Sequence, residues 1–131
     1  MTLKDFTERY VYKYDPSYDQ WRILKLEDDK YQGDCEDFSL SVLYYVICNE
    51  SLFAFWYQLI FGKAKMHYVD NNGGHAVLQW DGMYIDNWTK DWVSREHMES
   101  LGHKFHKRDY LFYQVALKML YTKIRGLFWW H

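Results

Sequence analysis

Apolar positions recur with a helical spacing through the first half of the chain. The pattern predicts three helices there, over residues 3–13, 35–49 and 52–61. Thr2 precedes the first segment and Asp34 precedes the second, and both residue types are favoured N-caps. The third segment ends at Gly62, a residue type that commonly terminates a helix. This half of the chain is therefore expected to be mainly helical.

After Gly62 the pattern changes to short segments that are compatible with β-strands. Strands are predicted at residues 63–69, 75–80 and 83–88, followed by a short helix at 94–101, a strand at 103–107 and a long helix from about 109 to 125. The dipeptide Asp81-Gly82 between the second and third strands is a strong hairpin signal. The order of elements predicts a single α+β domain, residues 1–131, with an antiparallel sheet between helices.

The predicted hairpin has a definite register. A two-residue turn pairs Trp80 with Met83, and side chains along each strand then alternate between two faces. His75 and Asp86 share one face as diagonal neighbours, about 7–8 Å apart between Cα atoms. Leu78 lies with other apolar residues on the opposite face, which is expected to pack on the core. A four-residue turn keeps this parity, whereas an unbulged three-residue turn would put the pair on opposite faces.

The composition is that of a folded chain, because 49% of its 131 residues are apolar and 21% are aromatic. The net charge of -2 gives no indication of a nucleic-acid partner. Residues 103–131 hold six Lys or Arg and one acid, so the last predicted helix is basic as well as aromatic. The sequence shows no secretory signal and no apolar run of about 18 residues, so a cytoplasmic location is expected.

Cys35 stands in the segment "GDCEDF", at the start of a predicted helix. A helix N-terminus lowers the pKa of a thiol, whereas the flanking carboxylates of Asp34 and Glu36 oppose this effect. With help from a nearby imidazolium, the helix terminus is expected to prevail and to make Cys35 a nucleophile; the alternative is a structural cysteine. The second cysteine, Cys48, would lie roughly 20 Å away on the same helix, so both are expected to be free thiols.

Cys35, His75 and Asp86 together suggest a catalytic triad. If Asp86 accepts a hydrogen bond from one ring nitrogen of His75, the other nitrogen is free to take the proton of the Cys35 thiol. Each residue alone also fits a structural role, and Asn87 could orient the histidine in place of Asp86. The hypothesis depends on the joint occurrence of the three residues, in one order and with the histidine and the acid on one face.

The segments "GDCEDF" and "GHAVLQWDGMYIDN" together resemble the bacterial transglutaminase-like cysteine peptidases, a branch of the transglutaminase-like, papain-related superfamily. The resemblance covers roughly residues 20–90. It implies a papain-like fold in which the catalytic helix packs on an antiparallel sheet. It also implies Cys35 as nucleophile, His75 as base and Asp86 as orienting residue, and Trp21 looks like the aromatic residue that precedes the cysteine in such sequences.

The same resemblance carries expectations about cofactor and origin. The chemistry requires no cofactor. Some exported members bind calcium through the acids that flank the cysteine, here Asp34 and Glu36, which would supply only part of the six to eight oxygen ligands that calcium takes. Short members that stand alone look like phage or prophage products, which implies the host cytoplasm as the location.

The expected reaction is cleavage of a peptide or isopeptide bond in a protein or peptide substrate, through a thioester on Cys35. The oxyanion would be held by the Cys35 backbone N–H and by a second donor from Gln32, Gln20 or Trp21. One alternative keeps the triad and transfers the acyl group to an amine, as a transglutaminase does. Another is a non-catalytic binding protein on the same fold that engages a host or structural protein through its aromatic C-terminal tail.

The remaining signals are weaker. His103 and His106 are expected to be solvated, since the sequence places no acid or cysteine partner beside them. The last helix is expected to cover the sheet and leave its lysines in water. Its final residues, "GLFWWH", could instead be an aromatic anchor for a protein partner or a membrane surface.

Overall fold

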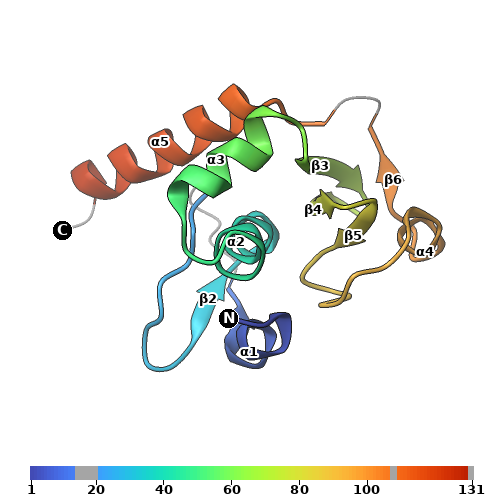
Figure 1. The fold of residues 1–131 in the computed structure, drawn as a ribbon, viewed down its shortest axis with the longest axis horizontal. Helices are drawn as coiled ribbons and strands as arrows, with labels where there is room; N and C mark the ends of the chain where they lie inside the picture. Colours follow the sequence, from blue (N-terminus) through green and yellow to red (C-terminus); the bar gives the residue numbers. More distant parts are fainter. Residues whose placement is uncertain (14–20, 107–108, 130–131) are drawn as a thin grey trace.

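The computed structural model describes residues 1–13, 21–106 and 109–129 and has the α+β class that the sequence predicts. A four-stranded antiparallel sheet lies beside a group of helices, and a small two-stranded sheet lies near the N-terminus (Figure 1). The order of strands in the larger sheet is β5-β4-β3-β6. One face of this sheet packs on helix α2, and α4 lies on its other side.

The chain begins with α1 (Leu3–Arg9), which is shorter than the predicted helix over residues 3–13. The predicted N-cap is confirmed: Thr2 forms a capping box with Asp5. The helix ends because the next residues form β1 (Tyr10–Tyr12), which pairs in parallel with β2 (Tyr31–Gly33). Aromatic and β-branched residues favour such an extended segment, and its pairing with a strand about 20 residues later is a tertiary interaction.

The predicted helix over residues 35–49 is present in two parts. An α-helix, α2 (Cys35–Ser41), continues as a π-helix, η1 (Val42–Ile47), in which the Cys48 N–H donates to the Leu43 carbonyl at 2.9 Å. The wider turn of the π-helix still packs in the core, because Val42 and Leu43 are both fully buried. As predicted, Asp34 caps the first turn, where it accepts a hydrogen bond from the Asp37 N–H.

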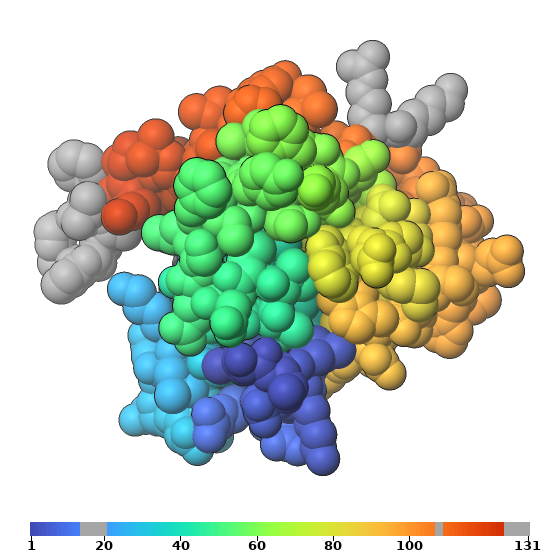
Figure 2. Space-filling view, viewed as in Figure 1, coloured from blue at the N-terminus to red at the C-terminus, as the bar shows by residue number. Residues whose placement is uncertain are grey.

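Two further helices lie side by side along one edge of the molecule (Figure 1). The first is α3 (Leu52–Ile60), which is followed by Gly62 with a φ of +68°, and the second is α5 (Phe112–Trp129). Both carry exposed apolar side chains, and α3 forms part of the surface seen in Figure 2. These exposed residues are Leu52, Phe53, Tyr57 and Ile60 on α3 and Phe112, Tyr113, Leu117, Leu120, Tyr121 and Ile124 on α5.

No single helix among residues 1–13, 21–106 and 109–129 is long and apolar enough to cross a membrane. The pair formed by Cys35–Ile47 and Leu52–Ile60 meets the length and composition criteria together, but it is bent by 114°.

The larger sheet confirms the predicted hairpin. Its strands are β3 (Ala64–Asp70), β4 (Gly74–Trp80), β5 (Met83–Ile85) and β6 (Lys104–Phe105), all antiparallel to their neighbours. Trp80 pairs with Met83, as the two-residue turn requires. Asp81 and Gly82 both have positive φ, at 52° and 75°, which is the backbone of a type I′ turn. The predicted strand over residues 83–88 is too long, because the chain leaves the sheet after Ile85 and turns back.

Both faces of the sheet are covered. Ala76, Leu78 and Ile85 are buried in the main core, which contains Phe38 of α2. On the other face a smaller cluster of buried residues includes Val69, Val77, Tyr84 and Met98, the last of these from α4 (Arg95–Ser100). The α4 helix therefore supports the face on which the sequence places His75 and Asp86.

We expect Leu78→Ala to lower the free energy of unfolding by about 2–5 kcal/mol, because Leu78 is fully buried in the main core and its loss leaves a cavity. Leu117→Ala is the matched control, since that leucine is 62% exposed and its truncation should change stability by less than about 0.5 kcal/mol. Urea denaturation of both variants measures the difference. Equal effects would contradict the register of the hairpin.

Candidate active site

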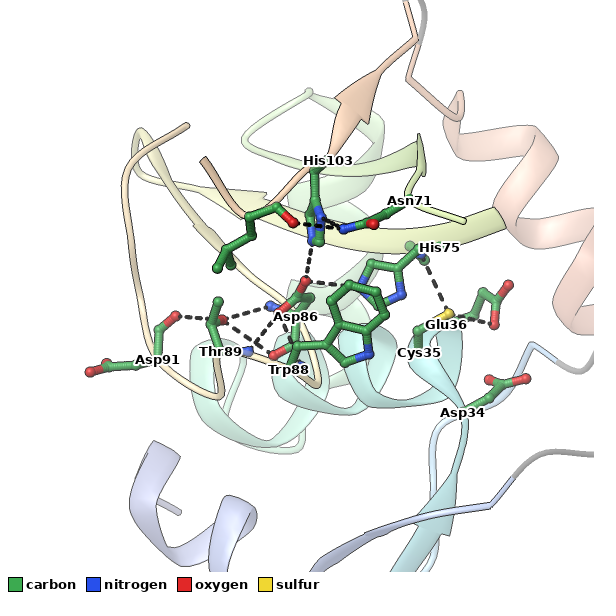
Figure 3. Close-up of polar contacts among 12 residues, drawn as sticks. Asp34, Cys35, Glu36, Asn71, His75, Asp86, Trp88, Thr89, Asp91 and His103 are labelled. Atoms are coloured by element: carbon green, nitrogen blue, oxygen red, sulfur yellow. Dashed lines mark hydrogen bonds and ion pairs between the residues drawn. The ribbon is translucent and has the colours of Figure 1, made fainter. Parts of the chain in front are cut away.

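Cys35 is the first residue of α2 and lies against the sheet. Its Sγ accepts a hydrogen bond from the Ala76 N–H of β4 at 3.4 Å and lies 3.3 Å from Glu36 Oε2 (Figure 3). The residue is partly exposed, as a nucleophile must be, and Cys48 is buried. Both are free thiols, in agreement with the sequence prediction. The sulfur atom thus connects the start of α2 to β4 through a hydrogen bond.

The other residues of the "GDCED" segment have local structural roles. Gly33 has no room for a side chain, since an added Cβ would lie 2.7 Å from both Asp37 Oδ2 and a Leu24 methyl. Asp37 is buried, although no role for it was predicted: its carboxylate accepts from the Asp34 N–H at 3.4 Å and from the Arg22 N–H at 3.0 Å. These contacts hold the loop before α2 against the helix and set the position of Cys35.

The protonation state of the thiol differs from the sequence expectation. Burial raises the pKa of Cys35 far above its ordinary value, and the neighbouring Glu36 carboxylate raises it further. The Ala76 N–H lowers the pKa, but not enough to compensate. The expected net lowering by the helix N-terminus is therefore wrong for this state, because the thiol is buried and because Glu36 points at the sulfur instead of away from it. The thiol is therefore neutral.

His75 and Asp86 meet as the hairpin register predicts. His75 Nε2 lies 2.8 Å from Asp86 Oδ2, and both side chains are buried. His75 comes from β4, whereas Asp86 lies immediately after β5 in a turn closed by hydrogen bonds to Thr89. The alternative orienting residue, Asn87, hydrogen-bonds to Tyr10 instead.

The carboxylate of Asp86 is surrounded by N–H groups. Its Oδ1 accepts from the backbone of Trp88 at 3.1 Å and of Thr89 at 2.8 Å. Burial alone would raise the pKa of Asp86, but hydrogen bonds from His75 and His103 outweigh it and hold the pKa well below the usual range. Since the carboxylate is ionised, it accepts a hydrogen bond from the N–H at His75 Nε2, and Nδ1 of the neutral ring is left as the basic nitrogen.

His103 is a member of the site that the sequence did not reveal. It is 2% exposed, and its Nε2 lies 2.6 Å from Asp86 Oδ2, so the expectation that it is solvated is wrong. His106 is about half exposed, but its Nε2 lies 3.1 Å from Asp70 Oδ2, so it has an acid partner too. Both partners are distant in the sequence, which is why spacing gave no signal for them.

A pocket of about 360 Å³ opens beside the sulfur. It is lined by Tyr10, Tyr12, Cys35, Asn71, Asn72, Gly73, Gly74, His75, Asn87, Trp88 and Lys90. The half-exposed indole of Trp88 stacks on the ring of His75, with the ring centroids 4.3 Å apart and the planes at 22°. Trp88 therefore restricts rotation of the imidazole and limits the access of water to it (Figure 3).

Cys35 and His75 line this same pocket but are not hydrogen-bonded to each other. Among the described residues, the hydrogen-bond partners of Sγ are the Ala76 N–H and the Glu36 carboxylate. Proton transfer from sulfur to imidazole thus requires a small approach of the two side chains, as is common before a substrate binds.

Two of the predicted oxyanion donors, Trp21 and Gln32, do not line the pocket. Trp21 is buried in the core, where its ring packs edge-on against Tyr110 at 4.9 Å. Gln32 lies on β2 and is partly exposed, and Gln20 lies outside the described residues. The backbone N–H of Cys35 belongs to the first turn of α2, where N–H groups have no partner within the helix.

Among the residues that the structure describes, two groups of side chains could bind a metal by residue type. Asp34 and Glu36 have other partners, since Asp34 caps α2 and Glu36 contacts the thiol; calcium binding there stays a prediction. A second group consists of His75, Asp86 and His103, whose ligating atoms all lie within 4.8 Å of one another. The members of this group are also hydrogen-bonded to one another, because His75 Nε2 and His103 Nε2 both contact Asp86 Oδ2.

Comparisons with known proteins returned no match of any kind to a family model, a curated protein or a solved structure. The case for a function therefore depends on the geometry of the chain itself, above all on the three side chains Cys35, His75 and Asp86.

We expect Glu36→Gln to speed alkylation of Cys35 by iodoacetamide about 3- to 10-fold at about pH 8. The substitution removes the negative charge that lies 3.3 Å from Sγ and raises the thiol pKa, so thiolate forms at lower pH. Peptide mass spectrometry measures the alkylation rate of Cys35, with the buried Cys48 as an internal reference. Glu96→Gln, an exposed change on α4, should leave the rate as it is; an unchanged rate in Glu36→Gln would count against the electrostatic account.

Proposed function

We propose that the chain is a thiol hydrolase of papain-like, transglutaminase-like architecture that cleaves a peptide or isopeptide bond in a protein or peptide substrate. The observation that carries the proposal is the pocket shared by Cys35 and His75, with Nε2 of His75 held by Asp86. This leaves Nδ1 as the basic nitrogen of the neutral ring, which is the arrangement that a thiol nucleophile needs.

The first half of the reaction forms a thioester. His75 Nδ1 takes the proton of Cys35, and the sulfur forms a bond to the carbonyl carbon while the C=O electron pair moves to oxygen. The Cys35 backbone N–H stabilises the oxyanion. When the oxyanion collapses, the C–N bond breaks and the leaving amine takes the proton from His75 Nδ1.

The second half restores the enzyme. His75 Nδ1 takes a proton from water, whose oxygen attacks the thioester carbon. The C–S bond then breaks, the acid product leaves, and the sulfur recovers its proton from the imidazolium. Asp86 retains its hydrogen bond to Nε2 throughout and stabilises the positive charge that appears on the ring in each half. Attack by an amine in place of water would give the transglutaminase-type transfer.

A non-catalytic binding function is a second candidate, and one observation favours it. The outer side of α5 carries an apolar stripe at helical spacing, with Tyr113, Leu117, Leu120, Tyr121 and Ile124 all exposed. Exposed apolar surface of this kind is typical of protein interaction sites. The final aromatic residues of the predicted anchor, 130–131, lie outside the described residues.

We expect the wild-type protein to release new peptide ends from a denatured proteome used as a peptide pool, measured by mass spectrometry. Cys35→Ala and His75→Ala should each lower the rate about 10³-fold or more, because each removes a group that takes part in bond making. Leu117→Ala is the control and should keep wild-type turnover. Equal product formation by Cys35→Ala and the wild type would refute the hydrolase proposal.

The same assay separates water from an amine as the second nucleophile. A labelled primary amine added at millimolar concentration should not be incorporated into the products if hydrolysis is the reaction. Incorporation that depends on Cys35 would assign the transglutaminase-type alternative instead.

A further inference from the structure

We propose that His103, held by Asn71, is a positioning residue that keeps Asp86 oriented toward His75. This inference rests on the proposed function for its effect on turnover, although the hydrogen-bond network itself can be tested without any activity. The network runs from Asn71 through His103 and Asp86 to His75, and His103 and Asp86 lie on the side of His75 away from Cys35 (Figure 3).

The orientation of Asn71 determines where the protons of the network lie. Asn71 Nδ2 donates to the Leu101 carbonyl at 3.0 Å, so this atom is the amide nitrogen and a donor. The same Nδ2 lies 2.9 Å from Nδ1 of His103. Since two donors cannot bond to each other, His103 Nδ1 is the acceptor. The proton of the neutral ring is therefore on Nε2.

The Nε2 proton of His103 is directed at Asp86. Nε2 lies 2.6 Å from Asp86 Oδ2, and His75 Nε2 lies 2.8 Å from the same oxygen. With the two backbone N–H groups on Oδ1, the carboxylate accepts four hydrogen bonds. Every lone pair that lies in the carboxylate plane is then in use, so the group cannot rotate without losing several bonds at once. Its fixed orientation fixes that of His75.

A metal ion at the same three side chains fits this pattern less well. A metal bound to His103 Nε2 would require a lone pair there and would move the proton to Nδ1. That proton would point at Asn71 Nδ2, which is itself a donor to the same atom. Asn71 therefore favours the proton network over metal binding.

The network makes a prediction for turnover. His103→Leu removes one N–H donor from Asp86 and should lower kcat about tenfold, because the orientation of the base is affected. KM should change less than about twofold, because His103 does not line the pocket and Asn71 keeps its bond to the Leu101 carbonyl. His103→Gln keeps an N–H donor at a similar reach and should recover kcat to within about threefold of the wild type. A role in stability alone would not show this rescue.

Two results from this assay would overturn the proposal: full kcat in His103→Leu, or equal loss in His103→Leu and His103→Gln when both variants are folded by circular dichroism. Either result leaves the roles of Cys35 and His75 intact, so it is distinguishable from failure of the proposed function.

Nitrogen-15 NMR of histidine-labelled protein tests the network independently of turnover. At neutral pH His103 should show a protonated Nε2 and a bare Nδ1, and His75 should show the same tautomer. In Asn71→Leu the Nδ1 atom of His103 loses its hydrogen-bond donor, so its nitrogen-15 shift should move toward that of a ring nitrogen without a donor, while Nε2 stays protonated. A wild-type spectrum with Nδ1 of His103 protonated would refute the network even if the protein proves to be an active hydrolase.

Discussion

The buried carboxylate of Asp86 is the constraint on which the site depends. An ionised group in the interior costs about 3–5 kcal/mol or more when it is left without partners, and here four N–H groups supply the compensation. Two of them come from the turn that follows β5, one from β4 and one from the segment after α4. These three parts of the chain are thus held together at one carboxylate, and the imidazole of His75 is placed as a result.

The thiol at the other side of the site lies in an environment that keeps it neutral. Burial and the Glu36 carboxylate both raise the pKa of Cys35, so no stable thiolate is present before a base acts. This differs from enzymes in which the thiolate and imidazolium exist as a resting ion pair. In the mechanism proposed above, His75 acts as a general base on a neutral thiol. The acids around the cysteine then limit its reactivity toward other compounds.

Features within a short span of the chain could be predicted from the sequence. Asp34 caps α2 and the Asp81-Gly82 turn sets the register of β4 and β5, because N-caps and two-residue hairpins depend on residues that are close along the chain. The parity of that register was enough to put His75 and Asp86 on one face. The α+β class and the contact between His75 and Asp86 were accessible for the same reason.

Other features depend on contacts between segments that are distant in the sequence, and only the tertiary structure shows them. The first helix is shorter than predicted because residues 10–12 pair with β2 instead of continuing the helix. Strand β6 pairs with β3 in a register that no local signal specifies. That second pairing brings His103 to Asp86, and it is why a histidine expected in solvent is buried. The burial of the Cys35 thiol, which is the largest cause of its raised pKa, likewise follows from packing of α2 on β4. The sequence by itself determined the helix start and the hairpin, whereas the full hydrogen-bond environment of the base and the charge state of the thiol were determined by long-range packing.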